Sequence, residues 1–252
     1  MTKIILDLCG GTGAWSKPYK EAGYDVRNIT LPKHDVRNAQ IIGHCINLKP
    51  YGILAAPPCT MFSFARTKAN KLRDLEEGMQ CVKACLKIIW GCMEIQQDTA
   101  KKKLPLKFWA LENPNGMLKF FLGKPAFEFN PYDFGDQYQK HTHLWGWFNE
   151  PKKSPVKLTK KQKELHKTNS QPLPVLKPYK SLNPKLQKKF DMLASREIAP
   201  KMFGKLTRQE RRAITPRGFA LAFYEANNIR IRPEETKGPH SPTYSAAETK
   251  RL

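Results

Sequence analysis

The chain begins with a short apolar run that ends in closely spaced glycines. Ile4–Leu8 has the character of a buried strand, and Gly10, Gly11 and Gly13 follow directly. Glycine lets the backbone turn sharply and approach a ligand without a clash from a Cβ atom. In an open α/β sheet, ligands bind beyond the carboxyl ends of the strands, where this turn would lie. The feature therefore predicts an α/β fold with a ligand site after its first strand, although a tight turn without function is an alternative.

The spacing of these glycines excludes two common nucleotide sites. The dinucleotide fingerprint Gly-x-Gly-x-x-Gly is not met, because Ser16 stands at its last position. A phosphate-binding loop that ends in Gly-Lys-Ser/Thr is also absent. We therefore expect a nucleoside-type ligand without a phosphate chain. Asp35, after the second predicted strand, is placed to accept a hydrogen bond from an adenine amino group, and a helix-capping role is an equal alternative.

Apolar runs alternate with helical stretches over residues 1–148, which predicts β-α units and a mostly parallel sheet flanked by helices. The expected strands are Ile4–Leu8, Asp25–Ile29, Gly52–Ala55, 108–112 and one within 137–148. A long helix is expected at 72–96, with Cys81, Cys85 and Cys92 on its buried face. We assign residues 1–148 to one catalytic core.

The composition changes after residue 148. Residues 149–207 are rich in Lys and Pro and are predicted to form a small basic region, with short helices at 160–166 and 183–195. Residues 208–230 are expected to return to the core through a helix at 215–227. The polar segment 231–252 is expected to be a disordered tail.

The chain carries 44 Lys and Arg against 22 Asp and Glu, a formal net charge of +22. A charge of this size predicts a polyanionic partner. No apolar run is long enough to cross a bilayer, and the first residues lack a signal-peptide pattern. We expect a cytoplasmic protein without a membrane partner, whose six cysteines are reduced because they show no paired spacing.

Two strand ends carry reactive side chains. Cys59 follows Pro57 and Pro58, which restrict the backbone and would hold a nucleophilic thiol at a rigid strand end. Glu112 and Asn113 come directly after the strand at 108–112. A carboxyl group in this position can be desolvated, stay protonated and donate to a ring nitrogen. The alternatives are a buried cysteine in a stiff loop and a polar turn.

Four segments of the chain resemble motifs of the cytosine carbon-5 methyltransferase family. They are 7–13 (DLCGGTG), similar to Asp-Leu-Phe-x-Gly-x-Gly; 58–63 (PCTMFS), which matches Pro-Cys-x-x-Phe-Ser; 112–114 (ENP), similar to Glu-Asn-Val; and 215–220 (TPRGFA), similar to the final motif. Cys9 stands where Phe is usual. The resemblance spans residues 1–148 and 208–228 and is greatest to the compact versions carried by bacteriophages.

The resemblance implies a Rossmann-like methyltransferase fold in which residues 149–207 form a small Lys-rich target-recognition appendage. It also implies that a cytosine is flipped out of the stack. Cys59 would add to carbon 6 and Glu112 would donate to ring nitrogen 3, so that carbon 5 accepts a methyl group before Cys59 leaves. Asn113 would hold Glu112 and its loop near Cys59.

The same resemblance implies S-adenosylmethionine as the cofactor. Gly11 and Gly13 would approach its methionine portion, Asp35 its adenine and Thr215 its other side. The remaining residues expected at the cofactor are Asp7, Trp15 and Pro58.

The chain departs from the family at two places. Residues 28–30 (NIT) lack the acid that usually binds the ribose hydroxyls, which leaves that contact open. The family motif Gln-x-Arg-x-Arg appears as 139–143 (QKHTH), so that His141 or Lys140 would take the place of an arginine at the catalytic site. The His-x-His pair also suggests a metal. Without a nearby third ligand on a strand, we expect none.

For the substrate, we expect double-stranded DNA, bound mainly through phosphate contacts by a monomeric protein in a bacterial or phage-infected cell. Two alternatives remain open. The first is an RNA cytosine carbon-5 methyltransferase of the tRNA type. The second is a non-catalytic nucleic-acid-binding relative, which the altered motifs at Thr30 and at 139–143 favour and the presence of Cys59 and Glu112 disfavours.

Overall fold

The computed structural model describes residues 2–64, 72–97, 106–136, 140–155, 205–206, 210 and 213–228. The helices expected at 160–166 and 183–195, the tail at 231–252 and most of the basic region at 149–207 lie outside these residues. Among the described residues, none of the helices combines the length and the apolar character needed to cross a bilayer.

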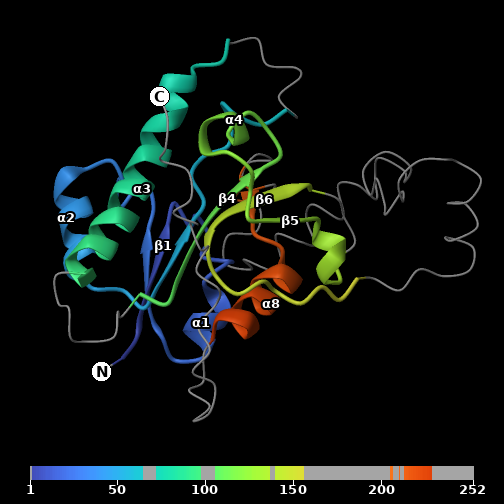
Figure 1. Ribbon diagram of the computed structural model, residues 1–252, viewed down its shortest axis with the longest axis horizontal. Coiled ribbons are helices and arrows are strands. Elements are labelled where there is room, and N and C mark those ends of the chain that lie inside the picture. Colours follow the sequence, from blue (N-terminus) through green and yellow to red (C-terminus); the bar gives the residue numbers. More distant parts are fainter. Residues whose placement is uncertain are drawn as a thin grey trace, which may run out of the picture.

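Six strands form one sheet in the order β2-β1-β3-β4-β6-β5 (Figure 1). Their bounds are β1 Ile4–Leu8, β2 Asp25–Ile29, β3 Gly52–Ala55, β4 Phe108–Pro114, β5 Phe127–Phe129 and β6 Thr142–Trp147. The strands at 4–8, 25–29 and 52–55 are confirmed at the expected bounds. The strand expected at 108–112 continues for two more residues, and the strand expected within 137–148 is β6.

The sheet is mixed, which corrects the prediction of a mostly parallel sheet. Strands β2, β1, β3 and β4 pair in parallel, whereas β6 is antiparallel to both of its neighbours, β4 and β5. Parallel neighbours need a crossover connection, and antiparallel neighbours do not. The described part of the connection from β5 to β6 holds only the short 3-10 helix η1 (Pro131–Phe134), so the chain returns in the opposite direction.

Helices cover both faces of the sheet. On one face, α2 (Ala39–Asn47) and α3 (Leu75–Gln97) pack on the sheet, and α1 (Lys17–Glu21) and α8 (Arg217–Asn227) cover the other (Figure 1). Strand β1 is buried on both sides, as expected for the middle of a helix-covered sheet, because Leu6 and Leu8 belong to one core and Ile5 to the other.

The helix expected at 72–96 is α3, and its cysteines pack as predicted. Cys85 and Cys92 are buried in the core between α2, α3 and the sheet, and Cys81 is half-buried beside them. None of the six cysteines of the chain is in a disulfide. A short helix, α4 (Lys119–Leu122), follows β4 and was not expected from the sequence.

Helix α8 returns from the end of the chain to the core. It begins after Pro216, close to the start expected for the helix at 215–227. The ring of Phe219 is stacked on Phe129 of β5, with centroids 4.0 Å apart and an interplanar angle of 13°, and it also contacts Trp15. The helix therefore joins the turn after β1 to the edge of the sheet.

We predict that Phe219→Ala destabilises the protein strongly. The ring is fully buried, and removing a buried phenylalanine typically costs about 3–5 kcal/mol of unfolding free energy. Leu221→Ala on the same helix is the matched control, because Leu221 is 47% exposed and its loss should cost roughly 0.5 kcal/mol. Urea denaturation of the two variants measures the difference, and equal losses would contradict the docking of α8.

Candidate active site

The turn after β1 requires its glycines. The backbone is left-handed at Gly11 (φ +53°) and Gly13 (φ +72°), a conformation that side chains rarely adopt. At Gly10 the limit is space, since a Cβ atom there would collide with the carboxyl group of Asp7. A Cβ atom built at Gly11 meets no atom within 4 Å, so this side of the turn faces open space. The turn can therefore receive a ligand against its backbone.

The end of β2 holds this turn in place. The side chain of Asn28 donates to the Gly11 carbonyl at 3.1 Å, and Thr30 Oγ1 accepts from the Gly11 amide at 3.3 Å. These two residues stand where the resembled family has a ribose-binding acid. Here their contacts with Gly11 give them a structural role that the sequence alone did not indicate.

Asp7 is fully buried beneath the turn. Its Oδ2 accepts a hydrogen bond of 2.5 Å from Ser16 Oγ, while its Oδ1 has no hydrogen-bond partner among the described residues. Burial raises the pKa of Asp7 to about 6, and the hydrogen bond from Ser16 opposes part of that rise. The site thus contains a buried acceptor atom with unused capacity.

The other residues expected at the cofactor lie in different settings. Trp15 is buried against Phe219 of α8 and is part of the core. The carboxylate of Asp35 is held by the guanidinium of Arg37, with contacts of 2.7–3.1 Å that lower the pKa of Asp35. Asp35 does not cap the next helix, since Asn38 accepts from the first amides of α2.

Thr215 and Pro58, the last two residues expected at the cofactor, lie on different segments of the chain. Thr215 is half-buried just before α8, and its neighbour Ile214 packs against Ala14 in the turn after β1. Pro58 is exposed, directly before Cys59. The structure therefore brings the segment at 215 close to the glycine turn.

The loops that follow β3 and β4 are fixed side by side. The buried side chain of Asn113 donates from Nδ2 to the Pro57 carbonyl at 3.0 Å. Beyond it, the Met117 amide donates to the Phe62 carbonyl at 2.8 Å, and Ser63 forms a β-bridge with Gly116. Since β3 and β4 are parallel, both loops leave the same edge of the sheet. We call the segment 57–63 the Cys59 corner and the segment 112–117 the Glu112 corner. These contacts place the two corners next to each other.

Cys59 begins a tight turn, and Arg73 stabilises this turn through two hydrogen bonds. The Cys59 carbonyl accepts from the amides of Phe62 and Ser63 at 3.0 and 2.9 Å. The guanidinium of Arg73 donates to the carbonyls of Met61 and Ser63 at 2.8 and 2.9 Å. The Cys59 residue is partly exposed. The local sequence did not indicate this role of Arg73, because its side chain contacts backbone carbonyls that lie 10 and 12 residues earlier in the chain.

Glu112 pairs with Lys140 and not with His141. The Lys140 Nζ lies 3.4 Å from Glu112 Oε1, and both side chains are largely shielded from solvent. His141, the other candidate for the place of the arginine, contacts Glu128 of β5 instead. Gln139 lies outside the described residues. Lys140 is therefore the cation that can act together with Glu112.

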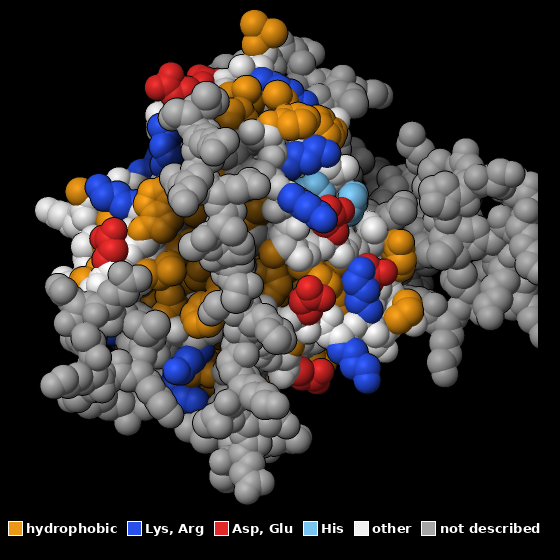
Figure 2. Space-filling view, in the orientation of Figure 1, with side chains coloured by type: hydrophobic (Ala, Val, Ile, Leu, Met, Phe, Trp, Pro, Cys, Tyr) orange, Lys and Arg blue, Asp and Glu red, His pale blue; other side chains and the backbone are white. Residues whose placement is uncertain are grey.

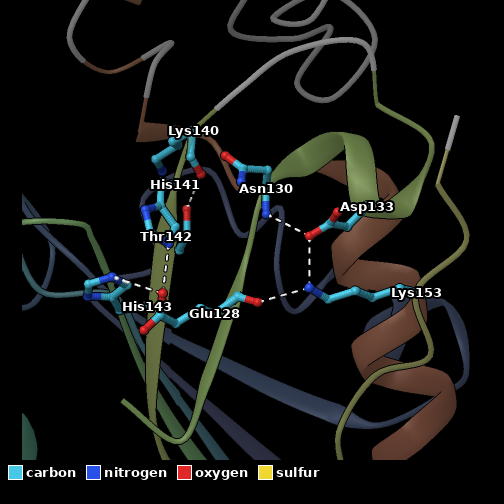
Figure 3. A network of polar contacts seen from close by, with 8 residues as sticks. All are labelled: Glu128, Asn130, Asp133, Lys140, His141, Thr142, His143 and Lys153. Atoms are coloured by element: carbon cyan, nitrogen blue, oxygen red, sulfur yellow. Dashed lines mark hydrogen bonds and ion pairs between the residues drawn. The ribbon is translucent and has the colours of Figure 1, made fainter. Parts of the chain in front are cut away.

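The fold places a third side chain that can bind a metal ion, Glu128, beside His141 and His143. His141, His143 and Glu128 each offer a ligand atom within 4.8 Å of the others (Figure 3). Glu128 is absent from the local sequence pattern, because it comes from β5 and reaches the histidines only through strand pairing. This third side chain removes the objection to metal binding that the sequence raised.

The charge that predicted a nucleic-acid partner falls mainly outside the described residues. On the face seen in Figure 2, Lys and Arg side chains of the described residues are interspersed with Asp and Glu. Residues 149–207 carry 15 Lys and Arg against 4 Asp and Glu, which is half of the net charge, and only residues 149–155 and 205–206 of this stretch are described. The basic segment that the sequence predicts to bind a polyanion therefore lies largely outside the described residues.

No protein-family model and no curated protein sequence matches this chain. Among solved structures, the chain is similar to a methyltransferase of Entamoeba histolytica, with a TM-score of 0.37 and 11% sequence identity. The match covers 63% of this chain and 58% of the other, so it spans less than two thirds of that protein's chain. At this level of similarity, conclusions about chemistry rest on the side chains described above.

We predict that Asp7→Asn changes how stability depends on pH. The ordinary pKa of 3.8 rises to about 6 in the fold, so the folded state keeps a proton that the unfolded chain releases. Wild-type stability should fall as pH rises from about 4 to about 6 and stay lower above it. Asparagine cannot ionise but still accepts from Ser16, so the variant should be more stable at pH 7 by up to roughly 3 kcal/mol.

Urea denaturation from pH 4 to 7.5 measures this difference, with Asp25→Asn as the control for a surface carboxyl. A constant gap between wild type and Asp7→Asn across the range would contradict the buried, shifted carboxyl.

We predict that Arg73→Gln loosens the loop after Cys59. Glutamine lacks the charged guanidinium whose two terminal nitrogens donate to these carbonyls, and hydrogen bonds from charged donors are worth about 1.5–3 kcal/mol each. Hydrogen exchange of the Phe62 and Ser63 amides should therefore accelerate by roughly tenfold or more. Arg27→Gln, which removes a surface guanidinium from β2, should leave these amides unchanged. Unchanged exchange in Arg73→Gln would show that the two hydrogen bonds from Arg73 do not stabilise the turn.

Proposed function

We propose that this chain is an S-adenosylmethionine-dependent methyltransferase that methylates carbon 5 of cytosine in double-stranded DNA, with Cys59 as nucleophile. The observation that carries the proposal is that hydrogen bonds hold the Cys59 corner beside the Glu112 corner. The Asn113 hydrogen bond to Pro57 and the pairing of Phe62 with Met117 hold the Cys59 loop beside the loop that follows Glu112. A thiol and a carboxyl–ammonium pair at one edge are the groups that this reaction needs.

The residues at the turn after β1 fit the cofactor. S-adenosylmethionine carries an ammonium group in its amino-acid portion, and Asp7 Oδ1 is a buried acceptor without a partner among the described residues. Gly11 faces open space, so a ligand can approach its backbone. Asp35 accepts from Arg37 through both oxygens, and its partly exposed carboxylate has further lone pairs for an adenine amino group. The bound cofactor would supply an electrophilic methyl group.

The side chains divide the reaction on the base among them. The Cys59 thiolate adds to carbon 6, forming a C–S bond while the electrons of the ring double bond move toward carbon 5. The protonated carboxyl group of Glu112 donates its proton to ring nitrogen 3, which neutralises the charge that develops on the ring, and the ammonium group of Lys140 stabilises the carboxylate that remains. After carbon 5 has accepted the methyl group, a base removes its proton. The C–S bond then breaks, and the thiolate of Cys59 leaves.

An aromatic and basic patch beside the Cys59 loop supports a nucleic-acid substrate. Phe64 and Phe120 are 45% and 69% exposed, and the Lys119 ammonium lies 5.6 and 5.7 Å from their ring centroids. Exposed rings stack on bases, and lysine pairs with phosphates. The Phe64 amide also contacts the Asn115 carbonyl, so the patch adjoins both corners. The basic segment at 149–207 would add phosphate contacts.

The test is covalent trapping on a cytosine that cannot complete the reaction. Duplex DNA containing 5-fluorocytosine should form an adduct with the protein that survives denaturing electrophoresis and depends on S-adenosylmethionine, because fluorine cannot leave carbon 5 as a proton does. Cys59→Ala should form no detectable adduct. Cys81→Ala, which removes another partly exposed thiol, should trap as well as wild type.

A parallel reaction with 5-fluorocytosine in tRNA tests the substrate. Trapping on RNA alone would move the assignment to an RNA methyltransferase. Trapping on neither, with a folded protein, would leave the nucleophile assignment without support and favour a non-catalytic nucleic-acid-binding protein.

A further inference from the structure

Glu128, His141 and His143 converge at the edge of the sheet. His141 directly precedes β6 and His143 is its second residue, so their side chains, two positions apart, point to the same face. Glu128 is the cross-strand partner of His143 in the antiparallel β5–β6 pair, which places it on that face too. Figure 3 shows the three side chains directed toward one another. The cluster is therefore a consequence of strand register.

The distances suit a shared cation. Glu128 Oε2 lies 2.8 Å from His141 Nε2 and 3.7 Å from His143 Nε2. Ligands bound to zinc at about 2.0–2.2 Å in a tetrahedral site are separated by roughly 3.3–3.5 Å. Small side-chain rotations would bring all three ligand atoms to that separation, since the atoms already lie within 4.8 Å of one another.

The surroundings hold the ligands in position. The His143 ring is buried between His141 and Trp145, with centroids 5.0 and 5.7 Å away and nearly perpendicular planes. Lys153 donates to the Glu128 carbonyl at 3.1 Å, and its charge is offset by Asp133 at 3.0 Å. A site whose side chains are already ordered loses little entropy when it binds an ion.

The donor set selects the class of ion. Two imidazoles and one carboxylate favour zinc and neighbouring divalent transition metals, whereas magnesium and calcium prefer oxygen ligands. His141 and Glu128 are 44% and 46% exposed, so an ion can enter from solvent and keep an open position for water.

We propose that Glu128, His141 and His143 bind a divalent transition-metal ion of the zinc type, which cross-links β5 to the start of β6. The site lies beside the proposed active site without being part of it. His143 is opposite Asn113 in the β4–β6 register, and Lys140, which pairs with Glu112, directly precedes His141. The ion would therefore fix the segment from which Lys140 reaches Glu112.

The experiment uses the full chain without a purification tag, freed of metal with a chelator and titrated with cobalt(II), whose visible absorption reports its ligands. One cobalt per chain should bind, with absorption bands of nitrogen and oxygen ligation and no thiolate charge-transfer band. Zinc should displace it. Loss of an outer-shell partner alone costs about 10- to 100-fold in metal affinity, so loss of a ligand in Glu128→Gln or His143→Gln should cost at least about 100-fold.

His44→Gln is the matched control, because it removes an exposed histidine on α2 and should bind as wild type does. Glu128→Gln keeps the test valid if the buried change at His143 impairs folding. Zinc should also raise the melting temperature of wild type and not that of Glu128→Gln. Absence of binding, equal binding by Glu128→Gln, or a thiolate band would overturn the proposal.

Discussion

The buried amide of Asn113 sets the arrangement of the two corners. It donates to the carbonyl of Pro57, a residue 56 positions earlier in the chain, and a buried carbonyl left without a partner costs about 1–3 kcal/mol. That cost favours the arrangement in which the loops after β3 and β4 lie side by side. Because Pro57 and Pro58 restrict φ, little freedom remains between the anchored carbonyl and Cys59. The position of the thiol thus depends on the residue next to Glu112.

The direction of the strands decides which groups meet where the carboxyl ends of the parallel strands lie. The carboxyl ends of β1, β3 and β4 lie together because these strands are parallel, which gathers the glycine turn, Cys59 and Glu112. Strand β6 runs in the opposite direction, so its first residues lie at that same edge. A parallel β6 would begin at the far edge of the sheet, away from Glu112. The departure from a mostly parallel sheet is therefore what brings Lys140 to the site.

The parts of the fold and site that the sequence could predict are those with a local signature. Strands β1 and β3 were predictable as short apolar runs bounded by turn residues, and Cys59 and Glu112 as reactive residues at strand ends. Strand β2 was predicted at its bounds, although only Val26 and Ile29 of it are apolar. Strand β5 has only three residues and exists through its pairing with β6. Arg73 and Glu128 act through partners distant in the sequence, and the choice of Lys140 over His141 depends on register. Such contacts follow from the fold and leave no periodic pattern.

The alternation of side chains along β6 separates two kinds of chemistry. Leu144 belongs to the core under α8 and Trp145 to the core under α3, so successive residues face opposite sides of the sheet. By the same alternation, Lys140 is directed to Glu112 while His141 and His143 are directed to Glu128. The lysine cannot compete for a metal ion, and the histidines cannot reach Glu112. An ion held by Glu128 and the histidines would therefore influence Glu112 only by fixing the backbone that carries Lys140.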